Sequence, residues 1–190
     1  QVERFKREAQ AASQLTHPNT IVVHDFGQDV DGTLFIAMEF LEGESLDQRL
    51  KRSPKPNPEW VVKILSQVCD SLQEAHAAGL VHRDLKPENI FLTHRQNDQD
   101  LVKVLDFGIA KVSHSPAGDT MDRLTQQGAI CGTPHYMAPE QIRDLPVDHR
   151  ADIYALGVLL YFLIAGHEPF DAAKVVDLLT MQIKEEPPPI

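Results

Sequence analysis

The stretch from Asn57 to Gly79 constrains the fold most, because it specifies the start, the buried face and the end of one long helix. Asn57 is a preferred N-cap, Pro58 suits the first helical position, and Glu59 places an acid in the first turn. Apolar residues then recur at helical spacing: Val61, Ile64, Leu65, Val68, Leu72 and Ala75. Gly79 supplies a C-terminal stop. We therefore expect a long helix with one apolar face, which other elements must cover.

The rest of the chain alternates between short strands and helices. Apolar spacing predicts helices over residues 2–15 and 46–50, near residue 138, and over residues 152–165 and 172–184. Strands are predicted over residues 20–26 and 33–40, which the turn-forming pair Asp31-Gly32 joins as an antiparallel pair. Shorter strands are predicted at residues 80–81, 90–93 and 101–105, and a mobile loop at residues 113–128. This order, mixed before residue 44 and mostly helical after it, indicates an α+β fold.

Composition and charge argue against several classes of protein. The 190 residues are 42% hydrophobic and 24% charged, which is ordinary for a globular protein and argues against disorder or fibrous structure. Acidic residues outnumber basic ones by 28 to 18, a net charge of −10, so neither a nucleic-acid partner nor an anionic lipid surface is expected. Cys69 and Cys131 cannot build a disulfide framework, which favours a reducing compartment.

No membrane segment is predicted within the chain. The most apolar run, residues 154–165, is shorter than the roughly 20 residues that a spanning helix needs. No targeting signal precedes Val2. Because the chain starts at Gln1 and ends in a proline run before Ile190, we expect it to be a piece of a longer protein, which could carry an anchor elsewhere.

Three blocks of polar and turn-forming residues carry the strongest chemical signal. The first, His82-Arg83-Asp84-Leu85-Lys86-Pro87-Glu88-Asn89, combines a base candidate, a cation and an amide in one loop. The second, Asp106-Phe107-Gly108, follows the predicted strand at residues 101–105. The third is Gly132-Thr133-Pro134-His135-Tyr136-Met137-Ala138-Pro139-Glu140. Taken singly, Asp84 is equally explained as a turn-capping acid and Asn89 as a turn former.

The histidines give no metal motif. All nine are scattered, without a His-Glu-x-x-His or paired-cysteine pattern, so a structural zinc is not expected. His82 is better interpreted as a packing residue that positions its loop. A Walker-type phosphate loop is also absent from the sequence.

The order and spacing of the three blocks resemble the eukaryotic-type serine/threonine protein kinases, and especially their bacterial members. The resemblance runs from Gln1 to Ile190 and implies a bilobal protein-kinase-like fold, truncated at both ends. Residues 1–40 would be a remnant of the N-lobe, with the helix that the family calls αC and the last antiparallel strands. Residues 41–190 would hold the hinge and a mainly helical C-lobe up to about αG. The resemblance also implies that the kinase domain is cytoplasmic.

The resemblance implies transfer of the γ-phosphoryl group of ATP to Ser/Thr hydroxyls of protein substrates. Asp84 would act as the catalytic base and Lys86 would approach the transferred group as a point charge. Asn89 and Asp106 would bind Mg²⁺ (or Mn²⁺), which prefers oxygen ligands. Thr133 would link to Asp84 and Lys86, although it is otherwise explained as a turn residue before a proline.

The same resemblance places the nucleotide base. The backbone groups of Glu39 and Leu41 would bond the adenine, with Met38 as the back wall of the pocket and Phe91 as its floor. Met38 and Phe91 are also explained as ordinary core and strand residues. Glu8 would pair with a lysine on a strand that precedes this chain, whereas by itself it would be a solvated helix acid.

Residues 109–132 correspond to the family's activation segment. Arg83 would hold a phosphorylated residue there, for which Thr125 is the first candidate and Thr120 the second; Ser113 and Ser115 follow. Asp152 is expected to anchor the backbone of the catalytic loop, or to interact with its own helix dipole, or both.

Two other functions compete with the kinase as interpretations of the sequence. A pseudokinase-like scaffold that binds protein partners without catalysis has no need to retain Asp84, Lys86, Asn89 and Asp106 together. A small-molecule phosphotransferase does not need the block at residues 132–140, which builds the peptide-binding floor in the family. Because Glu8 lacks its expected lysine and Glu140 would pair beyond Ile190, we expect the isolated chain to have negligible activity and weak ATP affinity.

Overall fold

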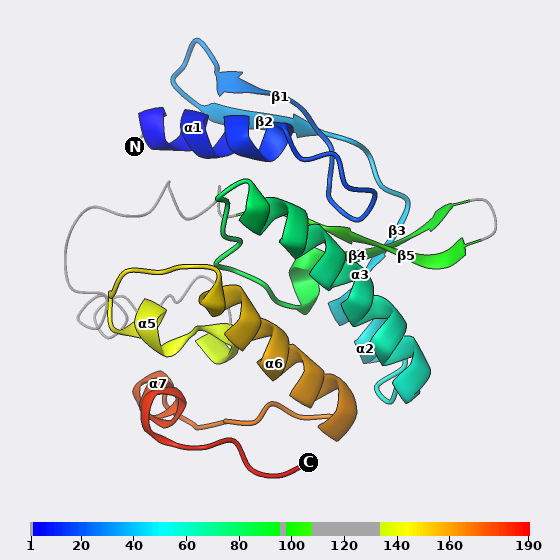
Figure 1. Cartoon of the computed structure of the whole chain (residues 1–190), viewed down its shortest axis with the longest axis vertical. Helices are drawn as coiled ribbons and strands as arrows, with labels where there is room; N and C mark the ends of the chain where they lie inside the picture. The colour runs from blue at the N-terminus through cyan, green and yellow to red at the C-terminus, as the bar shows by residue number, and fades with distance from the viewer. Residues whose placement is uncertain (1, 96–97, 108–133) are drawn as a thin grey trace.

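The computed structural model describes residues 2–95, 98–107 and 134–190. Helix α1 (Val2–Ser13) packs against an antiparallel pair of strands, β1 (Val23–Gln28) and β2 (Leu34–Met38). These elements form the upper part of the molecule in Figure 1. The apolar stripe of α1 explains its position, because Phe5, Ala9 and Ala12 are buried against the rest of the core.

A second antiparallel sheet lies below α1, in the order β3-β4-β5. Its strands are β3 (Gly43–Ser45), β4 (Ile90–Arg95) and β5 (Asp98–Val104). The other described elements are helical: α2 (Leu46–Arg52), α3 (Pro58–Ala77), the 3-10 turns η1 (Pro87–Asn89) and η3 (Pro134–Tyr136), α5 (Pro139–Ile142), α6 (Arg150–Ala165) and α7 (Val175–Lys184). The predicted α+β class is confirmed.

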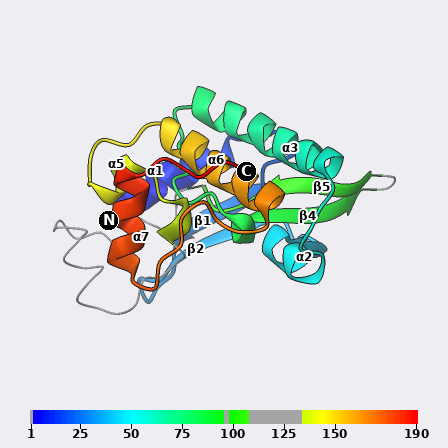
Figure 2. The same cartoon turned by 90° about the horizontal axis from the view of Figure 1, so that it is seen from below.

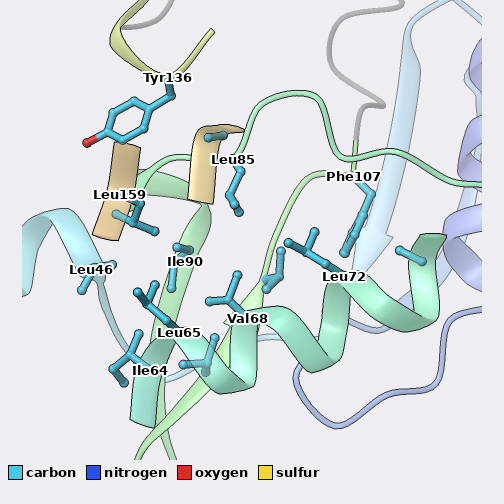
Figure 3. Packing of buried hydrophobic residues seen from close by; sticks show 14 of the residues in the cluster. Leu46, Ile64, Leu65, Val68, Leu72, Leu85, Ile90, Phe107, Tyr136 and Leu159 are labelled. Atoms are coloured by element: carbon cyan, nitrogen blue, oxygen red, sulfur yellow. The ribbon is translucent and has the colours of Figure 1, made fainter. Parts of the chain in front are cut away.

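Helix α3 begins and ends as the sequence predicts. The Asn57 side chain accepts a hydrogen bond from the Trp60 N–H (2.8 Å), and Pro58 occupies the first position. Gly79 ends the helix in a left-handed conformation with φ +75°, which a residue without a Cβ adopts at low cost. The buried side of α3 gathers with Leu46, Ile90 and Leu159 in the core of Figure 3. A fully buried side chain of this size stabilises the fold by about 1.5–3 kcal/mol.

Helix α6 lies beside α3, and Figure 2 shows the two helices with the β4–β5 ladder. It is apolar along nearly its whole length and ends at Gly166, which has φ +81°. One acid, Asp152, is buried in its first turn. Among the residues described, no helix combines the length and the apolar character needed to cross a membrane.

Three local features differ from what the sequence predicts. Strand β1 starts at Val23 rather than at residue 20, because Thr20 instead forms a parallel bridge with Val104 of β5. Residues 80–81 form no strand, although Leu80 is buried. Strand β3 was not predicted, since three residues are too few to show an alternating pattern. The predicted mobile loop at residues 113–128 lies outside the described residues.

Candidate functional site

The loop at residues 80–89, between α3 and β4, is held by a buried carboxylate from α6. Asp152 is 1% exposed, and its two oxygens accept the backbone N–H groups of His82 (2.9 Å) and Arg83 (2.8 Å). Its Oδ2 also lies 2.7 Å from Nε2 of His76 on α3. Arg83 has φ +63°, a conformation that costs a non-glycine residue free energy and that these contacts maintain. The expectation that Asp152 anchors this loop is confirmed.

His82 joins the loop to the end of β5. Its ring is fully buried, with Nε2 2.7 Å from the Leu105 carbonyl and Nδ1 3.2 Å from the backbone N of Asp84. Since Nδ1 accepts the Asp84 N–H, Nε2 carries the proton and donates it to Leu105. Burial lowers the pKa of His82 below its ordinary value, which favours the neutral ring that this pattern needs. The packing role expected for His82 is therefore observed, and its ring also contacts that of Phe107, with centroids 4.9 Å apart.

Three polar side chains meet at the turn that follows. Lys86 Nζ lies 2.9 Å from Asp84 Oδ2. The Asn89 side-chain nitrogen donates to the Asp84 carbonyl (2.8 Å) and approaches Oδ2 of the same residue (3.2 Å). Asn89 is buried, whereas the Asp84 side chain is one-third exposed. A carboxylate oriented by a cation and an amide is thus presented at the surface of the loop.

A second carboxylate lies next to this cluster. Ile90 pairs with Val104 across the β4–β5 ladder, and the Leu105 N–H donates to the Asn89 carbonyl (2.9 Å). The chain then turns at Asp106, which has φ +54° and an exposed side chain, while Phe107 is buried in the core. Leu105 therefore lies opposite Asn89, and Asp106 is the next residue along the chain.

Oxygen donors suited to a hard divalent cation are therefore available. Because the Asn89 nitrogen is engaged with Asp84, the amide oxygen is directed away from that contact. Asp106 adds a carboxylate. Within the described ranges, no three or more His, Cys, Asp or Glu side chains form a metal-binding group. Two oxygen donors still fit Mg²⁺, which usually takes one or two protein oxygens together with phosphates and water.

Glu8 of α1 faces the same loop from above. Its Oε1 lies 3.8 Å from Nη1 of Arg83, and both residues line a cavity with Arg7, Leu80 and Val81. The Arg83 side chain is one-third exposed, whereas that of Glu8 is 12% exposed. The structure therefore brings Glu8 close to the loop at residues 80–89.

The predicted adenine segment, residues 39–42, connects β2 to β3. Neither the Glu39 carbonyl nor the Leu41 N–H has a hydrogen-bond partner among the described residues. Met38 is 40% exposed and lines a small pocket with Ile36, Asp106 and Phe107, and Phe91 is half-buried in β4. The segment, the pocket and Asp106 thus lie in one region of the molecule.

Several predicted residues lie outside the described part of the chain: Gly108, Ser113, Ser115, Thr120, Thr125 and Thr133. Their assignments stay predictions. Glu140, for which a partner beyond Ile190 was expected, is half-buried in α5.

Two further residues support the site without being predicted from the sequence. Gln141 of α5 donates to the Arg83 carbonyl (2.8 Å) and so adds a second support to the loop at residues 80–89. Lys103 of β5 is 8% exposed and contacts Glu39. No local pattern marks Gln141. Lys103 did carry a signal, since a lysine within an apolar strand is unusual unless it is paired.

Comparisons with known proteins show the family of this chain. A family profile described as "Protein kinase domain" matches residues 1–187. The serine/threonine-protein kinase pkn3 of Myxococcus xanthus is 54% identical over 188 residues, which cover 99% of this chain and 34% of that protein. The chain therefore spans about a third of the length of this curated relative.

Solved structures of other proteins have a similar fold. The PknI kinase domain of Mycobacterium tuberculosis, a double mutant, matches with a TM-score of 0.71 and 34% identity, covering 98% of this chain and 62% of that one. Rad53 1-466 in complex with AMP-PNP matches with a TM-score of 0.71 and 28% identity, covering 93% and 41%. The chain belongs to the protein kinase family, and its relatives include bacterial serine/threonine-protein kinases.

Proposed function

We propose that this chain forms the catalytic core of a protein-serine/threonine kinase, which transfers the γ-phosphoryl group of ATP to hydroxyl groups of protein substrates. The observation that carries the proposal is the cluster of Asp84, Lys86 and Asn89 beside Asp106. The names of the relatives support the reaction class, and the bound AMP-PNP of Rad53 supports ATP as the donor.

Asp84 is proposed as the base that accepts or orients the proton of the substrate hydroxyl. The contacts to Lys86 and Asn89 orient its carboxylate before substrate arrives, which reduces the reorganisation needed during the reaction. A positioned general base contributes roughly 10²–10⁴-fold to the rate. Lys86 also supplies positive charge where negative charge develops on the phosphoryl group. In the substrate complex, Lys86 is proposed to contact both the Asp84 carboxylate and the transferred phosphoryl group.

Asn89 and Asp106 are proposed to hold Mg²⁺, or Mn²⁺ in its place. When bound, the cation neutralises charge on the phosphate oxygens. The chain's contribution is to fix the two donors relative to each other, through the Leu105 N–H bond to the Asn89 carbonyl. His82 supports the same junction from the other side, since it donates to the Leu105 carbonyl.

The Glu39 carbonyl and the Leu41 N–H are proposed to bond the adenine, between Met38 as back wall and Phe91 as floor. Their lack of a hydrogen-bond partner in the described part of the chain supports this assignment, because a planar base offers both a donor and an acceptor. Residues 1–40 would then belong to the smaller lobe, and residues 41–190 to the hinge and larger lobe.

The remaining family roles are proposals of the same kind. Glu8 would pair with a lysine outside this chain, and Arg83 would bind phosphorylated Thr125, or Thr120 as the second choice. Thr133 would contact Asp84 and Lys86. The kinase domain is proposed to act in the cytoplasm, with any membrane anchor outside this chain.

The proposal is tested with the full-length protein, radiolabelled ATP, Mg²⁺ and a general protein substrate. We expect label transfer to serine or threonine, identified by phosphoamino-acid analysis, and no transfer after chelation of the metal. The isolated 190-residue chain is expected to show negligible transfer. Nucleotide binding without any label transfer by the full-length protein would contradict catalysis and favour the pseudokinase-like scaffold.

A further inference from the structure

Lys103 is a buried cation for which the proposed chemistry has no use. Its Nζ donates to Glu39 Oε1 (2.6 Å) and to the Thr20 carbonyl (3.1 Å). Burying a lysine is costly unless it is paired and hydrogen-bonded, so these contacts define where Glu39 can lie. Glu39 Oε1 accepts a second bond from the Val22 N–H (2.9 Å), and the Glu39 N–H donates to the Val22 carbonyl (2.9 Å). Backbone and side chain of Glu39 are both fixed.

The other end of the adenine segment is fixed in the same way. Thr93 of β4 is buried, and its hydroxyl donates to the Glu42 carbonyl (2.7 Å). Between these two attachments the chain belongs to no helix or strand, and Phe40 is 89% exposed. The position of Leu41 therefore depends on the contacts at residues 39 and 42.

Both attachments come from one antiparallel ladder. Thr93 pairs with Leu101, and Lys103 pairs with Phe91, across β4 and β5. The same two strands are flanked by Asn89, which precedes β4, and by Asp106, which follows β5. One rigid two-stranded unit thus connects the proposed adenine contacts with the proposed metal ligands.

We propose that Lys103 and Thr93 are positioning residues for the nucleotide, which hold the Glu39 carbonyl and the Leu41 N–H in register with Asn89 and Asp106. This inference rests on the proposed function. Neither side chain touches the nucleotide. Each acts through the backbone of the adenine segment, so its loss weakens nucleotide binding more than it weakens the fold.

The test is calorimetric titration of the full-length protein with ATP and Mg²⁺. The Thr93→Val variant keeps shape and removes the hydroxyl; its Kd for ATP is expected to rise about three-fold. The Lys103→Met/Glu39→Gln double variant removes the ion pair, leaves no unpaired buried charge and keeps an acceptor for the Val22 N–H. Its Kd is expected to rise about ten-fold. Amide exchange over residues 39–42 should quicken in both variants without nucleotide.

Two matched controls separate positioning from stability. Thr180→Val removes a hydroxyl–carbonyl bond of 2.7 Å in α7, and Lys51→Met removes a 2.8 Å ion pair with Asp47 within α2. Both controls should keep the original Kd for ATP, with thermal unfolding measured for all variants.

Unchanged Kd and exchange in Thr93→Val would overturn the inference, and this variant decides alone if the double variant fails to fold. Equal losses of affinity in the controls would overturn it too, because the effect would then follow stability. Absence of ATP binding by the unmodified protein would instead contradict the proposed function, and this inference with it.

Discussion

The loop at residues 80–89 and the β1–β2 hairpin show that regular structure and fixed position are separate properties. Only the short turn η1 gives the loop regular structure, yet three other parts of the chain hold it by buried or half-buried polar contacts: Asp152 of α6, Gln141 of α5 and the Leu105 carbonyl beyond β5. The hairpin is an antiparallel ladder with one register shift between Val23 and Asp25, but Phe35 and Met38 are 40% exposed or more.

The two regions differ in whether water can replace the hydrogen bonds of their polar side chains. A buried carboxylate that accepts two backbone N–H groups cannot be replaced by solvent, so its loss leaves unsatisfied groups in the core. The hairpin's polar side chains bond mainly to their own turn, where water can substitute: Asp31 accepts from Thr33 and Gln28 donates to Gly32. We therefore expect matched substitutions to have unequal effects in the two regions.

The largest effect on stability is expected for Asp152→Ala. This change leaves the N–H groups of His82 and Arg83 without their buried acceptor and should lower the free energy of unfolding by about 2–4 kcal/mol. The matched change in the hairpin, Asp25→Ala, removes an exposed acid and should stay within about 0.5 kcal/mol. Urea unfolding of both variants checks the comparison, which equal effects would contradict.

The second largest effect is expected in the pH dependence of the free energy of unfolding, which His82 of the loop at residues 80–89 causes. Because the pKa of His82 is lower in the folded state than the ordinary 6.5, the unfolded chain binds more protons and stability falls as pH drops below about 6.5. The slope below pH 6.5 cannot exceed about 1.4 kcal/mol per pH unit, the limit for the uptake of one proton. Thermal unfolding across this range should show a shallower slope for His82→Gln. The hairpin control His24→Gln should retain the original slope; a shallower slope there would refute the assignment.

The smallest effect is expected for two glutamines, each of which donates a hydrogen bond to a backbone carbonyl. Gln141→Leu removes the 2.8 Å bond to the Arg83 carbonyl and the 3.0 Å bond that the Gln141 Oε1 accepts from the Ala138 N–H, and should cost about 1–2 kcal/mol. Gln28→Leu removes an exposed 2.9 Å bond to the Gly32 carbonyl and should cost less than about 0.5 kcal/mol. Both free energies come from denaturant titration. A larger loss in the hairpin variant would reverse the comparison.

The elements that the sequence predicted well are those whose signals are local. The cap at Asn57, the apolar stripe of α3 and the stop at Gly79 all lie within one helix, and the structure confirms them. Strand β3 and the bridge at Thr20 depend on pairing with strands far along the chain, so no local pattern identified them.

The same distinction holds for the site. The blocks at residues 82–89 and 106–108 mark Asp84, Asn89 and Asp106 directly. In the structure Asn89 bonds to Asp84, and Asp106 follows Leu105, whose N–H donates to the Asn89 carbonyl. Gln141 and Lys103 were missed because their partners lie 58 and 64 residues away. What a supporting residue contacts is a property of the tertiary structure, whereas the reacting groups are concentrated in short motifs.

In the proposed reaction, the fixed loop presents Asp84 as the base for phosphoryl transfer. The most direct measurement is kcat and KM of full-length Asp84→Asn, which keeps shape and removes the charge, beside Asp70→Asn, an exposed acid on α3. We predict that kcat falls by at least about 10²-fold for Asp84→Asn while KM for ATP changes little, and that Asp70→Asn retains full activity. An unchanged kcat in Asp84→Asn would contradict the account.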